Sequence, residues 1–403
     1  MSEHFFLYAS VAVLTIRSFW EFAFFRGKVS PLLIYTLCYF YFCFGPYIAY
    51  ILEIPIYSGI DKAELFQASI VFFLAISSLS IIPSNFISLI SSRFEIEIRR
   101  PQFFQQITTL IMFIPILFIF AFAFIKIGFA PLNKVQRIQS IGLLHYVILT
   151  LWPLFLFCYM TITPFSKITT KAKKTIFIVV LTYFSYCYYM GERDFALLLI
   201  PLYFWICKDK NISMWKLLIL VTVGAMLFTL MSAGRSEELS TSGLGSFLNQ
   251  GSNLMVTTNI INWLENGTEK WAGMSYLSSF LNMISLGAIK LTPALSIWFS
   301  RKYSPYVNDG AYGFSIEGEV ILNFGLIGVP IFFALVGIAI SSAFKGYINN
   351  KPFGTLMTYF ILFYFIYGIR GESLIIFKSF IYCCIIFFVL LFISQRGKFY
   401  LKY

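Results

Sequence analysis

Three arginines share a local pattern in which a glycine and an acidic residue lie within two positions of the arginine. They occur in Gly191-Glu192-Arg193-Asp194, Gly234-Arg235-Ser236-Glu237 and Gly368-Ile369-Arg370-Gly371-Glu372. A guanidinium group stays charged and binds a phosphate through two parallel hydrogen bonds, and an adjacent glycine lets a ligand approach the backbone. If the three arginines converge, they form a cationic pocket suited to a pyrophosphate group. Each could instead be an interfacial anchor that reaches lipid headgroups or pairs with its acidic neighbour.

A second polar segment, residues 310–325, contains the carboxyl groups of Glu317 and Glu319. Residues two apart lie on different faces of a helix, so we expect one of the two carboxyl groups to face a pocket. A carboxyl group close to a bilayer can have a raised pKa and act as a general base towards a substrate hydroxyl. We prefer Glu319 for this role because it is nearer to the following apolar segment. Alternatively, both acids stabilise the start of a helix through its macrodipole.

Three more ionisable residues, Arg17, His145 and Lys378, lie inside apolar segments. A neutral imidazole at His145 could serve as a base or as a hydrogen-bond donor. A buried histidine that bonds to a neighbouring helix is the simpler interpretation. An ionisable group within a membrane segment is a functional candidate by default, so Arg17 and Lys378 either have such a role or pair with an acid across the helices.

The composition indicates an all-α polytopic membrane protein. Hydrophobic residues make up 59% of the 403 residues and charged residues 12%, against roughly 45–50% and 25% in soluble domains. The formal net charge is +12, which could suggest a nucleic-acid partner. The basic residues are scattered between apolar segments, however, as the positive-inside rule describes. We therefore expect the partner of these charges to be a lipid bilayer and not a nucleic acid.

A membrane-spanning helix needs about twenty mostly apolar residues. This rule predicts eleven spans, at residues 5–25, 31–53, 65–91, 105–127, 141–163, 175–190, 194–207, 217–233, 325–344, 353–369 and 374–395. The sixth and seventh are short and are joined only by Gly191-Glu192-Arg193, so they form a helical hairpin with a charged tip.

The alternate loops differ in basic charge. One set is short and rich in lysine and arginine, at residues 26–28, 93–100, 167–174, 208–216, 345–351 and 396–402. The other set spreads fewer basic residues over a much longer sequence. The positive-inside rule therefore places the first set in the cytoplasm. The amino terminus, the Arg193 tip, the long loop and the Arg370 tip then face outward, and the carboxyl terminus is cytoplasmic.

The long loop, residues 234–324, is the largest interruption of the apolar pattern. We predict one membrane domain, residues 1–403, into which this loop is inserted as an extracytoplasmic subdomain. Its segments Asn253–Trp263 and Trp271–Ile289 are amphipathic and contain aromatic residues, so they are expected to lie along the interface or to cap a cavity. No internal repeat is visible, which argues mildly against a transporter built from inverted repeats.

Several familiar catalytic motifs are absent from the sequence. It contains no glycine-rich phosphate loop, no Ser-His-Asp order and no HExxH motif. The seven cysteines lack the spacing of metal ligands. Asp-x-Asp pairs, which would hold a metal-bound nucleotide sugar, do not occur either. We therefore expect no metal site and no redox or nucleotide cofactor.

The chain resembles the Wzy-type polymerases that assemble the oligosaccharide repeat units of O-antigen and capsule. The resemblance rests on the many-span plan, on the outward loop after Gly234-Arg235, and on the late outward arginine Arg370. It also rests on the passage from Gly313-Phe314-Ser315 through Glu319 to Asn323-Phe324-Gly325. One departure is that the Arg-x10-Gly pattern of some members is missing, because Ser246 stands where the glycine would be.

The resemblance implies a polyprenyl-dependent glycosyltransferase of the GT-C type in the bacterial inner membrane. Its substrate would be an undecaprenyl-pyrophosphate-linked oligosaccharide, its catalysis would be independent of metals, and a chain-length regulator protein is a candidate partner. Carried onto this sequence, Arg235 and Arg370 are the expected pyrophosphate contacts, and Glu319 is the expected base. Residues expected to bind the substrate as well are Arg193, Glu317, Asn323 and His145.

Other functional classes remain open from the sequence alone. An O-antigen ligase uses the same donor with a different acceptor and shares the polytopic plan. A flippase or other transporter would place charges along a path through the membrane, whereas most charges here lie at the outer interface. An acyltransferase or a scaffold is a third alternative, although an acyltransferase would want an acid beside its histidine and His145 has none close in sequence.

Overall fold

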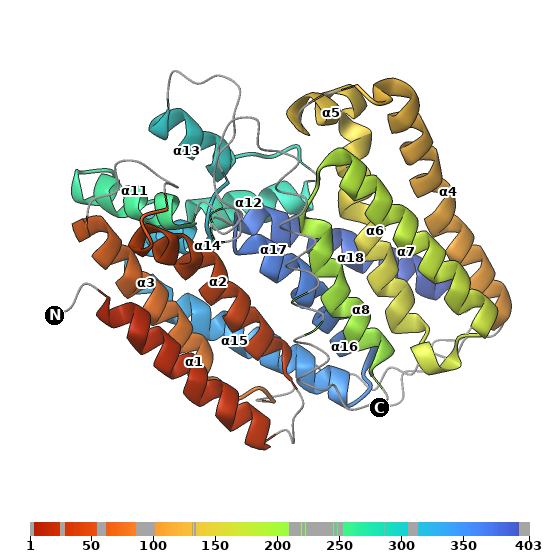
Figure 1. Ribbon diagram of the computed structural model, residues 1–403, viewed down its shortest axis with the longest axis horizontal. Coiled ribbons are helices and arrows are strands. Elements are labelled where there is room, and N and C mark those ends of the chain that lie inside the picture. Colours follow the sequence, from red (N-terminus) through yellow and green to blue (C-terminus); the bar gives the residue numbers. More distant parts are fainter. Residues whose placement is uncertain are drawn as a thin grey trace. The chain divides into compact units, whose positions relative to one another are not determined.

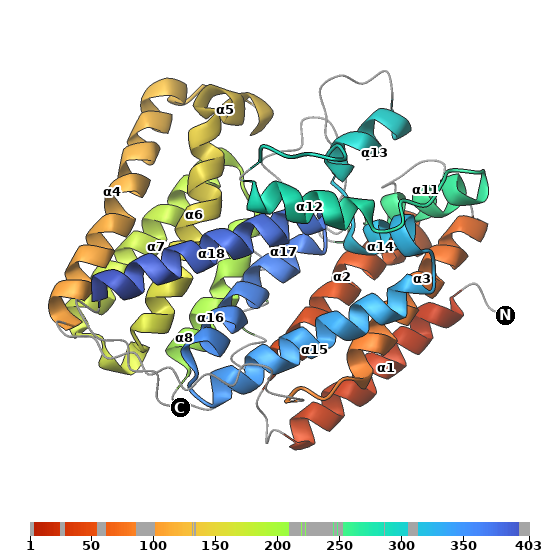
Figure 2. The same cartoon turned by 180° about the vertical axis from the view of Figure 1, so that it is seen from behind.

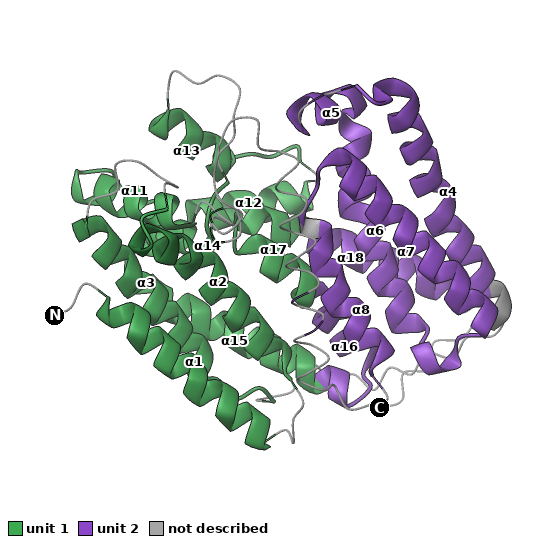
Figure 3. Cartoon of the chain, in the orientation of Figure 1, with its two compact units in different colours: residues 1–89, 241–345, 361–378 green, residues 90–240, 346–360, 379–403 purple. Residues whose placement is uncertain are grey.

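The computed structural model describes residues 4–24, 29–54, 62–85, 101–130, 134–208, 253–285, 287–304 and 313–394, together with the isolated residues 132, 219, 222, 245 and 248. Every regular element among these residues is a helix (Figures 1 and 2). The predicted all-α class is therefore confirmed. The chain divides into two compact units (Figure 3), of which unit 1 comprises residues 1–89, 241–345 and 361–378 and unit 2 comprises the remainder.

Seven of the described helices are long and apolar enough to cross a membrane. They are Phe5–Phe24, Pro31–Ile51, Lys62–Ile81, Phe104–Ile127, Leu143–Ile162, Gly328–Ile348 and Ser373–Ile393. Shorter apolar helices cover Phe195–Ile206 and Pro352–Gly368. The predicted spans overlap helices throughout, except for 217–233, which lies almost wholly outside the described residues. The chain is thus a multi-pass membrane protein.

Unit 1 contains the amino-terminal helices and the helices of the long loop. They are α1 (Phe5–Phe24), α2 (Pro31–Ile51), α3 (Lys62–Ile81), α11 (Asn253–Glu265), α12 (Met274–Ile284), α13 (Leu295–Tyr303), α14 (Ile316–Phe324), most of α15 (Gly328–Ile348), the π-helix η3 (Ile361–Phe365), α17 (Ile366–Gly368) and the first residues of α18 (Ser373–Ser394). Helices α1, α2 and α3 pack on one another, α11 packs on α2, α3 and α14, and α12 packs on α14. The described part of the long loop therefore shares a core with α2 and α3. The predicted subdomain boundaries, 234–324, stay a prediction.

A buried ion pair ties the first three helices of unit 1 together. The guanidinium of Arg17 donates to Oε1 of Glu21 from Nε at 3.1 Å and from Nη2 at 2.7 Å. Glu21 also accepts from the hydroxyls of Ser30 and Ser84, which come from the start of α2 and from the turn after α3. Arg17 is 4% exposed and Glu21 0%. Arg17 therefore pairs with an acid, as one of its two predictions stated, but the acid is Glu21 of its own helix and not one across the helices.

Helix α14 begins and ends at well-defined signals. Ser315 has extended backbone and its hydroxyl accepts from the backbone N–H of Gly318 at 3.0 Å, which is the usual capping bond at a helix start. Gly325 ends the helix with φ +68°, a conformation that favours glycine. Gly318 also lets α14 approach α11, because a Cβ atom there would lie 2.8 Å from the Val256 side chain. The position of α14 against α11 is thus closely fixed.

Unit 2 contains the central helices of the sequence. They are α4 (Pro101–Ile127), α5 (Lys134–Ile141), α6 (Leu143–Ile162), the 3-10 turn η1 (Phe165–Lys167), α7 (Thr170–Met190), the 3-10 turn η2 (Asp194–Leu198), α8 (Leu199–Ile206), α16 (Pro352–Phe360) and the rest of α18. Helix α4 packs on α6 and α7, and α16 packs on α6 and α8. Gly191, at φ +73°, ends α7 and begins the predicted charged tip.

The buried ion pair of α1 yields the first prediction. Replacing Glu21 by alanine leaves the Arg17 guanidinium buried without its carboxylate, which should cost about 3–5 kcal/mol of folding stability. The measurement is the unfolding free energy of the purified protein in detergent. Phe22→Ala is the control, because Phe22 is the next residue of α1 and is 55% exposed. A loss for Glu21→Ala no larger than that of the control would contradict the prediction.

Candidate active site

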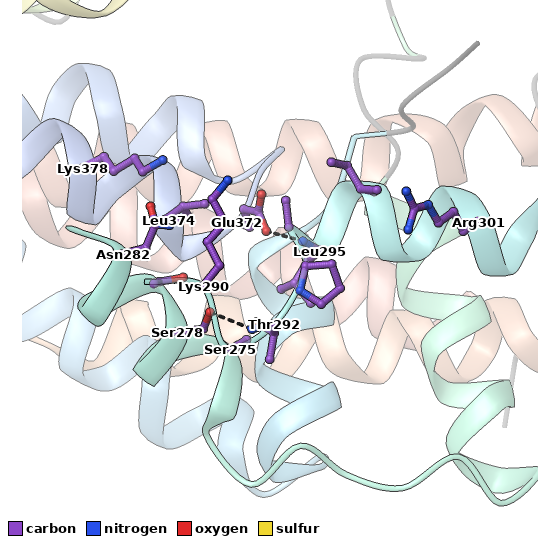
Figure 4. Close-up of a pocket in the computed structure, with 14 residues that line it drawn as sticks. Ser275, Ser278, Asn282, Lys290, Thr292, Leu295, Arg301, Glu372, Leu374 and Lys378 are labelled. Carbon is purple, nitrogen blue, oxygen red and sulfur yellow. Dashed lines mark hydrogen bonds between the residues drawn. The ribbon is translucent and has the colours of Figure 1, made fainter. Parts of the chain in front are cut away.

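A cavity of about 350 Å³ lies in unit 1 and is built from two separate parts of the chain. One wall comes from α12, from the segment between α12 and α13, and from α13. The other comes from Glu372 and the first turns of α18. Its charged and polar lining consists of Ser275, Ser278, Ser279, Asn282, Lys290, Thr292, Arg301, Glu372 and Lys378 (Figure 4).

Positive charge predominates around this cavity. Lys290 and Arg301 are exposed at its surface and Lys378 is half-buried, whereas Glu372 is the one ionisable carboxyl group among the lining residues. In the view of Figure 4, Arg301 lies at one end of the lining and Lys378 at the other, with Glu372 between them. Three cations against one carboxyl group leave an excess of positive charge, which suits an anionic ligand.

Glu372 has the environment of a proton acceptor that works near neutral pH. Its Oε2 atom accepts from the backbone N–H of Leu295 at 2.5 Å, which fixes the carboxyl group against the start of α13. The pKa of Glu372 is raised to about 7, first by burial and then by the charge of Glu319, against the opposing effects of the Leu295 bond and Lys378. A carboxyl group with this pKa can accept or return a proton at physiological pH.

Glu319 lies directly behind the cavity wall. It is 0% exposed, and its Oε1 atom accepts from the hydroxyls of Ser275 and Ser373, both at 2.7 Å. Its Oε2 atom accepts from the backbone N–H of Ser373 at 2.7 Å. Burial raises the pKa of Glu319, against the opposing effect of these hydrogen bonds. Since Ser275 lines the cavity, one hydrogen bond separates Glu319 from it.

Asn323 completes this network on the next turn of α14. Its side-chain amide donates to the Ser275 hydroxyl at 2.8 Å and to the Glu319 carbonyl at 2.7 Å. Its side-chain oxygen accepts from the backbone N–H of Gly273 at 2.9 Å. Asn323 is 2% exposed. Through Gly273 and Ser275 it hydrogen-bonds both to the residue before α12 and to the first turn of α12.

Glu317 faces another side of α14 and other partners. Its Oε1 atom accepts from the Asn253 side-chain amide at 2.9 Å and from the Thr257 hydroxyl at 3.3 Å, both on α11. It is 0% exposed, and burial raises its pKa to about 7 against these hydrogen bonds. The two carboxyl groups thus lie on different faces, as expected. The expectation that one of them faces a pocket does not hold for this cavity, because neither lines it.

Arg370 lies on the turn that leads to Glu372 and α18. Its guanidinium carbon is 5.5 Å from the centre of the Phe42 ring on α2, within the range of a cation–π contact. Arg193 lies half-buried at the tip after α7 and belongs to unit 2. Arg235 lies outside the described residues. Convergence of the three arginines therefore stays a prediction.

His145 has an acidic neighbour in the structure that the sequence did not indicate. Its Nε2 atom lies 3.2 Å from Oε1 of Glu192, and its Nδ1 atom lies 2.8 Å from the Tyr186 hydroxyl. The other oxygen of Glu192 accepts from Lys134 at 2.8 Å. His145 is 0% exposed, which matches the simpler interpretation of a histidine bonded to a neighbouring helix. Its predicted role in substrate binding is untested.

No local pattern in the sequence singles out Lys290, Arg301, Ser275 or Glu372 as members of one site. Lys290 and Arg301 are two of the scattered basic residues of the long loop, and Glu372 is the acidic neighbour of Arg370. Lys378 carried the one usable signal, a cation inside an apolar segment. The other residues come together through the packing of α12 and α13 near the start of α18, which no local pattern reveals.

The fold and the cationic cavity define an all-α, multi-pass membrane protein with a site suited to an anionic substrate. The chain matches the family of the O-antigen polysaccharide polymerase Wzy over residues 2–402, nearly its whole length, and it belongs to that family. It is therefore a membrane protein of polysaccharide biosynthesis whose broad function is the polymerisation of O-antigen repeat units. Comparison with curated proteins and with solved structures gave no significant match.

The Glu192 contacts of unit 2 predict a specific dependence of stability on pH. Burial alone would raise the pKa of Glu192, but His145 and Lys134 outweigh it and lower the pKa from 4.5 to about 2. A lowered carboxyl pKa stabilises the fold above the unfolded value of 4.5, and this stabilisation is lost as the pH falls towards 2. It amounts to about 3 kcal/mol.

We therefore expect Glu192→Gln to be less stable than the wild type at pH 7, and the difference to shrink between pH 4.5 and pH 3. The measurement is the thermal unfolding midpoint of both proteins in detergent across this range. A difference of equal size at pH 7 and pH 3 would show that the charge of Glu192 does not supply the stabilisation.

Proposed function

We propose that this polymerase joins undecaprenyl-pyrophosphate-linked oligosaccharide repeat units on the outer face of the bacterial inner membrane. The growing glycan is transferred from its lipid carrier to the next lipid-linked unit. In this proposal the cavity of unit 1 receives the pyrophosphate group of the donor. The amino terminus faces outward and the carboxyl terminus is cytoplasmic, as the charge pattern predicts.

The observation that carries the proposal is the convergence of Lys290, Arg301 and Lys378 on one cavity. A pyrophosphate is multiply charged, and cationic side chains at fixed positions stabilise the charge that develops on it as it leaves. The location of the cavity supports the same assignment. Its lining comes from the long loop and from the residues that follow the Arg370 tip, which the charge pattern places on the same, outer face.

The chemistry of the transfer needs few protein groups, because the donor is already activated. A hydroxyl of the acceptor sugar attacks the anomeric carbon of the donor sugar, and a new glycosidic C–O bond forms. The bond between the anomeric carbon and the pyrophosphate oxygen breaks, and undecaprenyl pyrophosphate leaves with the electron pair. The proton of the attacking hydroxyl passes to the carboxylate of Glu372. The protein thus supplies positioning, charge neutralisation and one base.

In this proposal Lys290, Arg301 and Lys378 supply the positive charge that the leaving pyrophosphate needs, and catalysis is independent of a metal ion. A divalent metal such as Mg²⁺ is held by oxygen ligands, usually carboxylates and phosphates. The cavity instead offers lysine and arginine for the same electrostatic task. Retention of activity in the presence of a chelator would support this part of the proposal, and its loss would count against it.

The arginines predicted from the sequence keep a place in the proposal. Arg370 precedes Glu372 by two residues on one turn, and we propose it as a second contact for the pyrophosphate. Arg235 and Arg193 remain predicted contacts that no described distance links to the cavity. A chain-length regulator protein remains a predicted partner.

Two adjacent residues of α13 provide a matched test of the cavity. Arg301 lines it, whereas Lys302 donates to the Thr268 hydroxyl at 2.7 Å and lies over the Trp263 ring. We expect Arg301→Ala to lower the polymerisation rate by at least about tenfold, because it removes charge that stabilises the leaving pyrophosphate. Lys302→Ala should change the rate less than twofold or so, since Lys302 does not line the cavity.

The measurement is the surface polysaccharide ladder in a strain that lacks the protein and carries each variant at an equal level. Lys290→Ala and Lys378→Ala should reduce the ladder in the same way as Arg301→Ala. If all three cavity variants gave the same ladder as Lys302→Ala, the cavity would have no part in the mechanism.

The role of Glu372 predicts a pH profile. Glu372→Gln can keep the bond from the Leu295 N–H through its amide oxygen but cannot accept a proton, so the rate should fall by about 10²–10⁴. In the wild type the rate should fall as the pH drops below about 7, because protonation removes the base. The measurement is the initial rate of the purified enzyme with lipid-linked repeat units from pH 5.5 to 8.5. A wild-type rate for Glu372→Gln would exclude Glu372 as the base.

A further inference from the structure

We propose that Glu317 and Glu319 are positioning residues, which from two faces of α14 hold the two ends of the turn that carries Arg370 and Glu372. This inference rests on the proposed function, because it explains how the proposed base and its neighbouring arginine are set at the cavity. It differs from the sequence prediction, in which Glu319 is itself the base.

The carboxyl-terminal end of the turn is held by Glu319. Both oxygens of its carboxyl group bond to Ser373, one to the backbone N–H and one to the hydroxyl, each at 2.7 Å. Ser373 is the first residue of α18 and directly follows Glu372. A carboxylate at this position also suits the positive end of the helix dipole. Any shift of Glu319 would therefore move the start of α18 and the Glu372 backbone with it.

The amino-terminal end of the turn is held by Glu317 through Asn253. The side-chain amide of Asn253 donates to Glu317 at 2.9 Å and to the backbone carbonyl of Ile369 at 2.8 Å. Ile369 directly precedes Arg370. The same carbonyl accepts from the backbone N–H of Ile316 at 3.4 Å, so α14 contacts this end directly as well. Glu317 orients the amide that fixes the residue before Arg370.

The glutamates themselves are not placed to contact a substrate. Both are 0% exposed and neither lines the cavity. Only residues 370–372 lie between Ile369 and Ser373, the two positions that are held from α14. Glu372 also accepts a hydrogen bond from the Leu295 backbone. Catalytic groups lose activity steeply when they are misplaced, by about 10² for a displacement of about 1 Å. Glu317 and Glu319, on one short and capped helix, thus account for the fixed position of Glu372.

The charges around Glu372 make the role of Glu319 testable by pH. Glu372 is faced by Glu319 from α14, by Lys378 from α18, by Lys290 from the segment before α13 and by Arg301 from α13, and Arg370 lies on its own turn. The negative charge of Glu319 raises the pKa of Glu372. Removing that charge while keeping the hydrogen bonds should make Glu372 release its proton at a lower pH.

The experiment compares Glu319→Gln, Glu319→Ala, Glu317→Gln and Glu372→Gln as full-length proteins in lipid nanodiscs. Rates are measured with lipid-linked repeat units across pH 5.5–8.5, together with thermal stability. In Glu319→Gln the amide oxygen can accept from the Ser373 N–H, while the amide N–H₂ can donate to the serine hydroxyls. We expect the maximum rate of this variant to stay within about tenfold of the wild type. The acidic limb of its pH–rate profile, where the rate falls as Glu372 is protonated, should shift to lower pH.

Glu319→Ala should lose at least about a hundredfold at every pH, because the turn is no longer held. Glu317→Gln is the matched control, since it carries the same change on the same helix. Whatever its rate, the midpoint of its acidic limb should stay at the wild-type value, because Glu317 is not among the charges that raise the pKa of Glu372.

Three outcomes would overturn the inference. Glu319→Gln could be as inactive as Glu319→Ala, which would indicate that Glu319 is the base. Its acidic limb could stay where it is in the wild type, or Glu319→Ala could keep the wild-type rate. If Glu319→Ala does not fold, the inference is decided by the midpoint of the acidic limb of the stable Glu319→Gln variant. A fully active Glu372→Gln would instead overturn the proposed function, so the two failures are distinguishable.

Discussion

The hydrogen bonds that the buried Glu319 carboxyl group accepts from Ser275 and Ser373 are the interaction on which the cavity depends. They join α12, α14 and the start of α18, three elements that are far apart in the sequence. A carboxyl group that is removed from water must have hydrogen-bond partners, or its burial costs several kcal/mol. The same requirement that stabilises the carboxyl group therefore determines where the cavity walls meet.

Two groupings of ionisable side chains in the described residues contrast with each other. Arg17 with Glu21, and Lys134 with Glu192, are matched pairs in which each charge has a close opposite partner, and His145 also contacts Glu192. The cavity of unit 1 is unmatched, because three cations surround the single carboxyl group of Glu372. Matched sets hold helices together, whereas an excess of one sign attracts a ligand of the other. This difference separates the structural polar clusters from the candidate active site.

The sequence allowed the helical elements and the family to be predicted, because both depend on patterns along the chain. Runs of apolar residues gave the spans, and their predicted limits overlap the described helices. The spacing of Glu317 and Glu319 correctly placed them on different faces of one helix. Lys378 could be recognised as a candidate because a cation inside an apolar run is unusual.

The site itself could not be assembled from the sequence, because its residues meet through packing. Lys290 and Arg301 lie some distance from Glu372 along the chain and share no motif with it. The acidic neighbour of His145 is Glu192, which lies on a separate element. The preference for Glu319 as base followed from its nearness to a span, whereas its role depends on partners that only the folded structure brings to it.

The central claim is that the cavity of unit 1 takes the pyrophosphate of the lipid-linked donor. The most direct measurement is an experimentally determined structure of the protein in a lipid nanodisc with an undecaprenyl-pyrophosphate-linked repeat unit bound. We expect pyrophosphate density within hydrogen-bonding distance of Lys290, Arg301 or Lys378, with the first sugar beside Glu372. Density for the pyrophosphate at Arg193 in unit 2, with the cavity of unit 1 empty, would contradict it.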